Sequence, residues 1–262
     1  MIKIKRFQEI TMKVFILNKK KLLSLGLIII LSVIFTSINT VVLVSQNNPK
    51  KIPIYSVARP DSKIALTFNC AWGCEDISKI LDTLDKYKIK ATFFIVGTWA
   101  KKYPEELKEI DKRGHEIGAH SYNHAHYKDM SYEEILKDME KCDAVIENVI
   151  GKDIFYVRGG YGEYNDSVIK ACEDSGRTYI QWSTDSLDYK LKSPEEILNR
   201  VIKNTSSGDI ILMHTGTEYT KDALDSILLE LLKNYEPVKI SDLIFKENYT
   251  IDHTGKQIKD NV

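Results

Sequence analysis

The chain has 262 residues, and its 37 basic and 37 acidic residues give a formal net charge of zero. This length allows one sizeable domain with a buried core, and a hydrophobic content of 43% is ordinary for a folded protein. Because nucleic-acid binding needs a basic footprint, the balanced charge gives no support to a nucleic-acid partner, and none is expected.

The first predicted element is a transmembrane helix over residues 22–45. This stretch has no charged residue and is mostly aliphatic, and about 20 apolar residues suffice to span a bilayer. Seven basic residues precede it, so residues 1–21 are expected in the cytoplasm and the rest of the chain outside. A cleaved signal peptide is the alternative, but the run is longer than usual and no A-x-A site follows it. We therefore expect a single-pass protein of the cell membrane with an extracytoplasmic domain.

Residues 46–62 are polar, contain three prolines, and are expected to form a linker. A folded domain is predicted over residues 63–247, followed by a C-terminal tail over residues 248–262. Strand-like apolar runs occur at residues 63–68, 91–96, 116–120, 155–158, 178–182, 209–214 and 237–240. Helix-like stretches lie at residues 76–88, 104–113, 131–149, 165–175, 193–205 and 220–234. This alternation predicts a parallel α/β fold, either a closed barrel or an open doubly wound sheet.

Two histidines four residues apart, His120 and His124, begin where the strand expected at 116–120 ends. If this turn is helical they share one face, which suits a metal bound by two imidazoles. A polar surface loop is the alternative, because His115 and His126 flank the pair.

Polar residues also mark the ends of three other expected strands: Arg158, the cluster from Asp185 to Asp188, and His214. In parallel α/β folds the carboxyl ends of the strands hold the active site. A charged Arg there suggests a carboxylate partner, and an Asp can orient an imidazole. Each has an ordinary structural alternative, such as a turn, a cap or a buried histidine, but their joint occurrence favours a site.

In this order the motifs resemble those of the polysaccharide deacetylase domain of carbohydrate esterase family four, also called the nodulation deacetylase homology domain, over about residues 60–245. The family's motifs are Thr-Phe-Asp-Asp-Gly, His-Ser/Thr-x-x-His, Arg-Pro-Pro-Tyr-Gly, Asp-Trp and Leu-x-His. The corresponding residues here are Thr67 to Gly73, His120 to His124, Arg158 with Tyr161 and Gly162, Asp188 with Tyr189, and Leu212 with His214. The Trp-Gly pair after the first motif is similar to the branch associated with sporulation.

The resemblance implies a distorted (β/α) barrel of about seven parallel strands that removes N-acetyl groups from amino sugars of a cell-envelope polysaccharide such as peptidoglycan. The implied partners are the acetylated glycan substrate and a divalent metal, expected to be zinc. The membrane is a further expected partner, because of the apolar run at residues 22–45. The implied catalytic residues are His214 as general acid, Asp188 to orient it, Asn69 at the position of the base, and Arg158 to hold that base. The implied metal ligands are His120, His124 and Cys70, and the substrate pocket is implied to contain Tyr161, Leu212 and Tyr189.

The first motif departs from the family pattern at its two acidic positions. Asn69 replaces the base, and a carboxamide cannot take a proton from water. Cys70 replaces the metal carboxylate, and a thiolate could complete a zinc site with the two histidines. Glu75 and Asp76 could supply a replacement carboxylate. The alternative function is therefore a catalytically impaired deacetylase-like protein that binds envelope or spore-wall glycan.

Overall fold

The computed structural model describes residues 24, 26–37 and 50–260, and the chain divides into two units, residues 1–50 and residues 51–262. In the first unit, residues 24 and 26–37 are helical. Part of the membrane span predicted at 22–45 lies outside the described residues. Among the residues that are described, no helix combines the length and the apolar character needed to cross a membrane.

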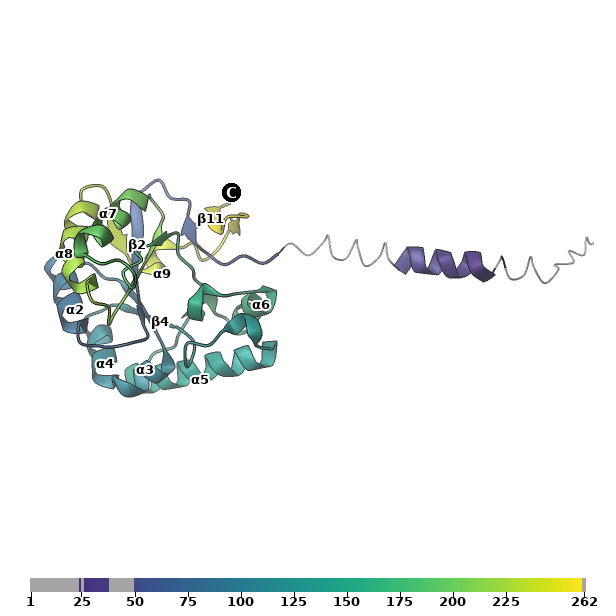
Figure 1. Cartoon of the computed structure of the whole chain (residues 1–262), viewed down its shortest axis with the longest axis horizontal. Helices are drawn as coiled ribbons and strands as arrows, with labels where there is room; N and C mark the ends of the chain where they lie inside the picture. The colour runs from purple at the N-terminus through teal and green to yellow at the C-terminus, as the bar shows by residue number, and fades with distance from the viewer. Residues whose placement is uncertain (1–23, 25, 38–49, 261–262) are drawn as a thin grey trace, which may run out of the picture. The chain divides into compact units, whose positions relative to one another are not determined.

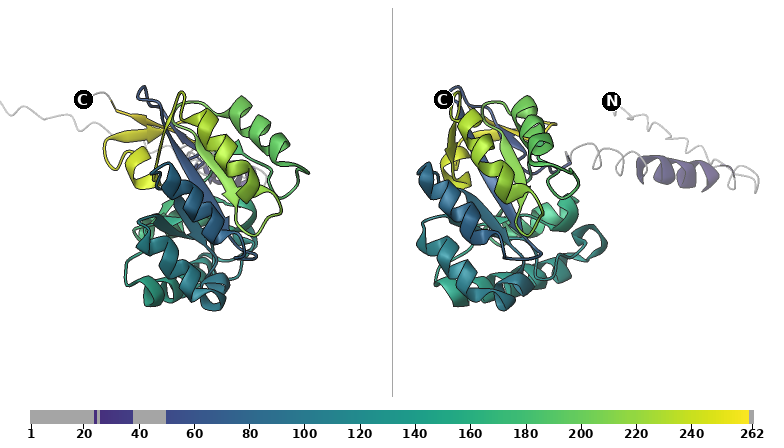
Figure 2. Two further views of the ribbon diagram at one scale, coloured as in Figure 1. Left: turned by 90° about the vertical axis from the view of Figure 1, so that its left-hand side faces the viewer. Right: turned by 60° about the vertical axis from the view of Figure 1, so that its left-hand side comes forward.

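The second unit is built on one parallel sheet with the strand order β6-β5-β4-β3-β2-β8-β7, to which β9 adds beside β2. The strands are β2 Lys63–Cys70, β3 Thr92–Ile95, β4 Glu116–Ala119, β5 Tyr156–Val157, β6 Thr178–Tyr179, β7 Thr184–Asp185, β8 Ile210–His214 and β9 Glu236–Val238. Figure 2 shows β2 in blue beside β8 in green, although they lie far apart in the sequence. The sheet curls into a half-barrel, which confirms the predicted α/β fold.

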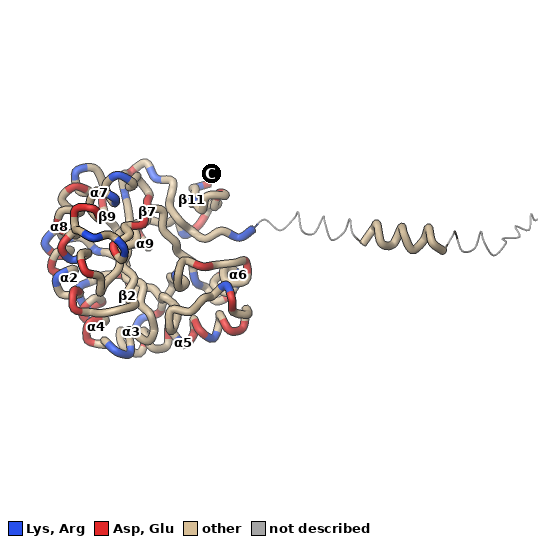
Figure 3. The backbone as a smooth tube through the Cα atoms, in the orientation of Figure 1, with Lys and Arg blue, Asp and Glu red and all other residues tan. Residues whose placement is uncertain are grey.

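Helices cover the outer face of this sheet (Figure 1). They are α2 Ile77–Lys86, α3 Gly97–Lys102, α4 Pro104–Lys112, α5 Tyr132–Ile150, α6 Asp166–Asp174, α7 Pro194–Asn204 and α8 Thr220–Leu231. The short helix α9 Ile240–Leu243 packs instead in a separate cluster with Ala65 and Phe94, and two 3-10 turns cover Tyr127–Asp129 and Gly160–Gly162. Helix α5 begins with a capping box, in which Ser131 and Glu134 bond each other's backbone N–H. Lys, Arg, Asp and Glu are mixed along the outer helices (Figure 3).

The alternation of side chains along β2 separates the outer core from the site. Leu66, Phe68 and Cys70 are fully buried in the large cluster under the helices. Thr67 and Asn69, whose side chains leave the opposite face of the strand, reach the buried guanidinium of Arg158. The side chains of Leu66, Phe68 and Cys70 on one face of β2 therefore stabilise the domain. Thr67 and Asn69 on the other face point towards the candidate site at the carboxyl ends of the strands.

Residues expected to form a linker and a tail contribute a second, three-stranded sheet. It has the order β1-β11-β10, with β1 Ser56–Val57, β10 Tyr249–Ile251 and β11 Lys256–Lys259. The turn between β10 and β11 is closed by Asp252, whose side chain accepts from the backbone N–H groups of Thr254 and Lys256. None of these three strands was predicted from the sequence.

Candidate active site

Parallel register brings four of the candidate residues to one end of the sheet. Asn69 on β2 and His214 on β8 are direct partners. His120 follows β4 and donates its backbone N–H to Ile95, at 2.8 Å, and Arg158 follows β5 and donates to Ala119, at 2.9 Å. The backbone ladders thus hold these side chains at successive strand ends.

The strand ends surround a cavity of about 360 Å³. It is lined by Asn69, Trp72, His120, His124, Tyr161, Gly162, Trp182, Asp185, Tyr189, Leu212 and His214. The lining of the cavity therefore includes all three residues predicted for the substrate pocket, Tyr161, Leu212 and Tyr189. It also includes Trp72, Trp182 and Asp185, for which the sequence predicted no role in the pocket.

A buried carboxylate fixes the orientation of His214. The His214 Nδ1 atom lies 2.7 Å from Asp188 Oδ1, and the His214 backbone N–H donates to Asp188 Oδ2 at 2.7 Å. Thr220 donates its hydroxyl to the same Oδ2, at 2.6 Å. Since Nδ1 faces the carboxylate, Nε2 is the nitrogen left for chemistry in the cavity. This is the arrangement that a general acid requires.

The two histidines of the His-x-x-x-His motif meet edge to face, with ring centroids 4.9 Å apart. His120 Nδ1 lies 2.8 Å from the carbonyl oxygen of Arg158, while its buried Nε2 has no partner. Burial lowers the pKa of His120 well below its usual value and also lowers that of His124, so both are neutral at pH 7. A neutral imidazole with a free Nε2 is the form that binds a metal. These residues fit two ligands of a divalent ion.

Asn69 accepts a hydrogen bond from Arg158, with 2.9 Å between Oδ1 and Nη1. Arg158 also donates to Thr67 and to the carbonyl groups of Ile180 and Gln181. All of these partners are uncharged, and burial lowers the pKa of Arg158 to about 9. The guanidinium thus lies beside Asn69, the predicted position of the base, and none of its hydrogen-bond partners among the described residues is a carboxylate.

The structure does not bring Cys70 to the two histidines. Consecutive side chains of a strand point to opposite faces, so Cys70 points away from Asn69 and into the outer core. Burial raises the pKa of its thiol. Among the described residues, Cys70, His120 and His124 do not form a group whose ligand atoms lie close enough together to share one metal ion.

Neither candidate replacement carboxylate lines the cavity. Glu75 is exposed and accepts the backbone N–H of Cys74, at 3.0 Å. Asp76 is buried, and both of its carboxylate oxygens lie 2.9 Å from the backbone nitrogen of Gly216. Asp76 therefore ties the loop after β2 to the loop after β8. Asp185 lines the cavity, and one of its oxygens accepts the backbone N–H of Leu187.

The loop after Arg158 places Tyr161 over the histidines. Tyr161 has a left-handed backbone (φ 59°), and its ring meets that of His124 edge to face at 4.4 Å. The preceding Gly160 lies so close to the loop of His124 that an added Cβ would come within 2.7 Å of the Ala125 carbonyl oxygen. Glycine is thus required where the family pattern has proline.

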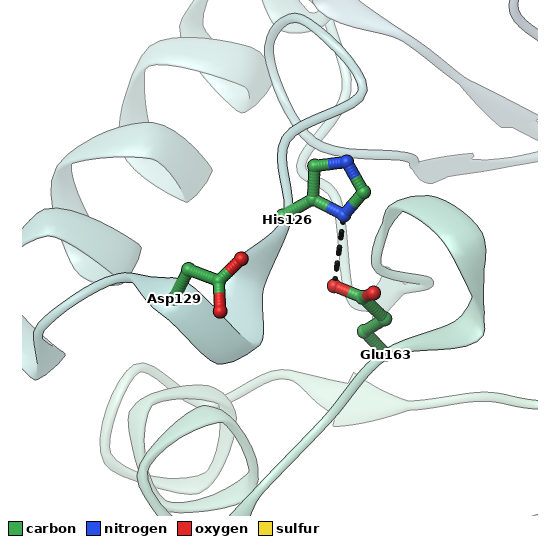
Figure 4. A group of neighbouring side chains, drawn as sticks. All are labelled: His126, Asp129 and Glu163. Atoms are coloured by element: carbon green, nitrogen blue, oxygen red, sulfur yellow. Dashed lines mark hydrogen bonds and ion pairs between the residues drawn. The ribbon is translucent and has the colours of Figure 1, made fainter.

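Beside the cavity, the ligand atoms of His126, Asp129 and Glu163 lie within 4.8 Å of one another. His126 faces Glu163 at 3.1 Å, whereas Asp129 is not bonded to either (Figure 4). The other oxygen of Glu163 pairs with Lys128, at 2.6 Å. This ion pair accounts for the cluster without a metal.

Residues 56–180 match the family model for polysaccharide deacetylase. The chain is 34% identical over 197 residues to a peptidoglycan-N-acetylglucosamine deacetylase of Bacillus cereus, an alignment that covers 72% of this chain and 92% of that protein. It is 31% identical over 193 residues to YlxY of Bacillus subtilis, covering 73% of this chain but only 60% of YlxY.

Among solved structures, BA3943 of Bacillus anthracis, a CE4 family pseudoenzyme, matches with a TM-score of 0.71 and 34% identity. The match covers 73% of this chain and 68% of that chain. A mutant of BA3943 with restored enzymatic activity matches with the same TM-score.

Proposed function

Because this chain belongs to the polysaccharide deacetylase family, we propose that it removes N-acetyl groups from amino sugars of a cell-envelope polysaccharide. Peptidoglycan is the proposed substrate, since the Bacillus cereus relative that is covered over 92% of its length is a peptidoglycan-N-acetylglucosamine deacetylase. The reaction is hydrolysis of an amide, which releases acetate and leaves a free amine on the sugar.

The observation that carries this proposal is the pair of Asp188 and His214 at the wall of the cavity. Amide hydrolysis needs a proton for the departing amine, since an amine leaves poorly as an anion. His214 can deliver that proton from Nε2 while Asp188 fixes Nδ1 and stabilises the charged ring. Leu212, also in the cavity wall, offers an apolar contact for the acetyl methyl group.

We further propose that His120 and His124 hold a divalent metal, with zinc as the expected ion. When bound, such an ion would polarise the amide carbonyl and lower the pKa of a water molecule. Replacing both histidines with Ala is expected to abolish stoichiometric metal in elemental analysis of the purified protein. An unchanged metal content would place the ion elsewhere.

A second candidate function, glycan binding with little or no catalysis, is favoured by Asn69. Its carboxamide accepts a hydrogen bond from Arg158 and has no basic lone pair for a water proton. The similarity to BA3943, a pseudoenzyme, agrees with this second reading. Loss of a positioned base costs roughly 10²–10⁴-fold in rate, so slow hydrolysis and binding alone are the two outcomes to separate.

The deciding experiment measures acetate release from N-acetylglucosamine oligomers and from purified peptidoglycan. Under the deacetylase proposal the wild-type chain releases acetate and His214→Ala does not, because the amine loses its proton donor. His253→Ala is the matched control, since His253 is exposed in the turn between β10 and β11. Glycan binding without acetate release from any variant would establish the second function instead.

We propose that the domain acts outside the cell, anchored by the apolar segment at residues 22–45. The support is the charge pattern, with seven basic residues before a charge-free run. Protease added to intact protoplasts is expected to digest the domain, and protection until lysis would refute export.

A further inference from the structure

The two histidines proposed to hold the metal are oriented by different kinds of contact. The imidazole of His120 is fixed by a polar atom, since its Nδ1 lies 2.8 Å from the carbonyl oxygen of Arg158. The ring of His124 has no hydrogen bond to any other residue that the structure describes, and it meets the rings of His120 and Tyr161 edge to face, at 4.9 Å and 4.4 Å. An imidazole turns easily about its last side-chain bond, and a metal-binding histidine usually has its second nitrogen fixed by an oxygen atom. His124 therefore depends on ring packing for its orientation.

The ring of Tyr161 needs support of its own to orient His124. It is 60% exposed, so most of its surface has no protein neighbour that would stop it from turning. The imidazole of His126 stacks on it, with ring centroids 4.0 Å apart and an interplanar angle of 1°. The rings of His124, Tyr161 and His126 thus form one continuous series of contacts.

The outer end of this series is anchored by Glu163. Its Oε2 lies 3.1 Å from His126 Nδ1 (Figure 4), and its Oε1 pairs with Lys128 at 2.6 Å. The backbone of Glu163 is fixed as well, because its carbonyl accepts the hydroxyl of Tyr179 and its N–H donates to Gly160. The ring of His126 is therefore held in place by the loop that follows β5.

We propose that His126 is a positioning residue for the metal site, and that it acts by holding Tyr161 against His124. His126 lies two residues beyond the His-x-x-x-His motif and does not line the cavity, and its Nδ1 is engaged by Glu163. Its effect on the site passes through the ring of Tyr161. The ring stack thus does for His124 what the Arg158 carbonyl does for His120. This inference rests on the proposed metal pair and deepens it.

The test measures the affinity of the full-length chain for zinc, by competition with a chromophoric chelator. His126→Ala is expected to weaken zinc binding by about tenfold, within the roughly 10–100-fold range for loss of a group that orients a metal ligand. His126→Phe keeps a ring that can stack on Tyr161 but cannot bind a metal, so it should keep most of the affinity. His253→Ala, which removes an exposed histidine far along the chain, is the matched control and should not differ from the wild type.

A double-mutant cycle tests whether His126 acts through Tyr161. Tyr161→Ala is expected to weaken zinc binding at least as much as His126→Ala does. The double variant should then bind zinc no more weakly than Tyr161→Ala alone, because both changes remove the same support. Losses that add in full would contradict this path.

The outcomes separate the positioning role from the proposals on which it rests. An unchanged zinc affinity in a folded His126→Ala protein would refute it. An equal loss in His126→Phe would refute it too, because the imidazole would then be a ligand itself. A wild-type chain that binds no zinc at His120 and His124 would refute the metal site and the positioning role together. The expected zinc affinities in a chain that releases no acetate would support the positioning role and refute only the proposed hydrolysis.

Discussion

Asn69 differs from an aspartate only in carrying an amide NH2 group where aspartate has a second carboxylate oxygen. The surroundings of Asn69 suit a carboxylate better than an amide. The Asn69 side chain lies in the cavity wall, 2.9 Å from the guanidinium of Arg158. Arg158 is fully buried, and its hydrogen-bond partners carry no charge. A buried cation without a counter-ion is costly, which is why burial lowers the pKa of Arg158.

We therefore predict that Asn69→Asp raises the rate of acetate release by roughly 10²–10⁴-fold. The adjacent guanidinium favours the charged form of the new carboxyl, which could then accept a proton from water at neutral pH. The measurement is the initial rate on the N-acetylglucosamine tetramer. Asn69→Ser is the control, since it removes the amide without adding a base. A folded Asn69→Asp protein with the wild-type rate would show that the missing base does not limit activity.

At the scale of elements, the loop from β2 to α2 is tied to the loop from β8 to α8. The tie is Asp76, a buried residue at the start of α2 whose carboxylate accepts the backbone N–H of Gly216. Burial raises the pKa of Asp76, and the bond from Gly216 opposes that rise. The carboxylate therefore has a structural partner of its own, away from the cavity.

Asp76→Ala is predicted to lower the free energy of unfolding by about 1–3 kcal/mol, because it leaves the Gly216 N–H without its partner. Asp76→Asn keeps an acceptor oxygen and should lose less than half as much. Urea unfolding of the three proteins measures both effects. Acetate release by Asp76→Asn should stay within a few-fold of wild type. A drop of 10²-fold or more would mean that Asp76 acts as the base after all.

At the scale of the whole molecule, stability is expected to fall on mild acidification because of His115. This side chain is 4% exposed, and its Nδ1 accepts the backbone N–H of Ala91, at 3.1 Å. Burial, together with Lys90 and Arg113, lowers its pKa to about 4. Between pH 6.5 and pH 4 the unfolded chain binds a proton at His115 that the folded chain does not. Stability contributed by neutral His115 is therefore complete above pH 6.5 and is lost as the pH falls towards 4.

The expected contribution of His115 is about 3 kcal/mol over that pH range. His115→Asn removes the titrating ring but keeps an acceptor for Ala91, so its stability should fall less steeply between pH 6.5 and 4. Urea unfolding at several pH values measures both slopes, and the difference between them isolates His115 from the other titrating groups. Equal slopes for the two proteins would contradict the prediction.

Local patterns in the sequence determined the class of fold and the general place of the site. Buried parallel strands are short apolar runs, and the helices between them carry their own start and stop signals, so β2, β3, β4 and β8 could be predicted without tertiary contacts. His120, Arg158 and His214 stand out for the same reason. Each is a polar residue at the end of an apolar run, and parallel strands bring such ends together.

Only the tertiary structure decided which residues that lie close together in the sequence also face the same cavity. Cys70 is adjacent to Asn69 in sequence but lies on the other face of β2. Trp72 reaches His214 across two loops. The small sheet pairs Ser56 with Lys256, at opposite ends of the domain. The physical reason is that contacts between distant segments depend on the twist of the sheet and on loop packing, neither of which leaves a periodic signal in the chain.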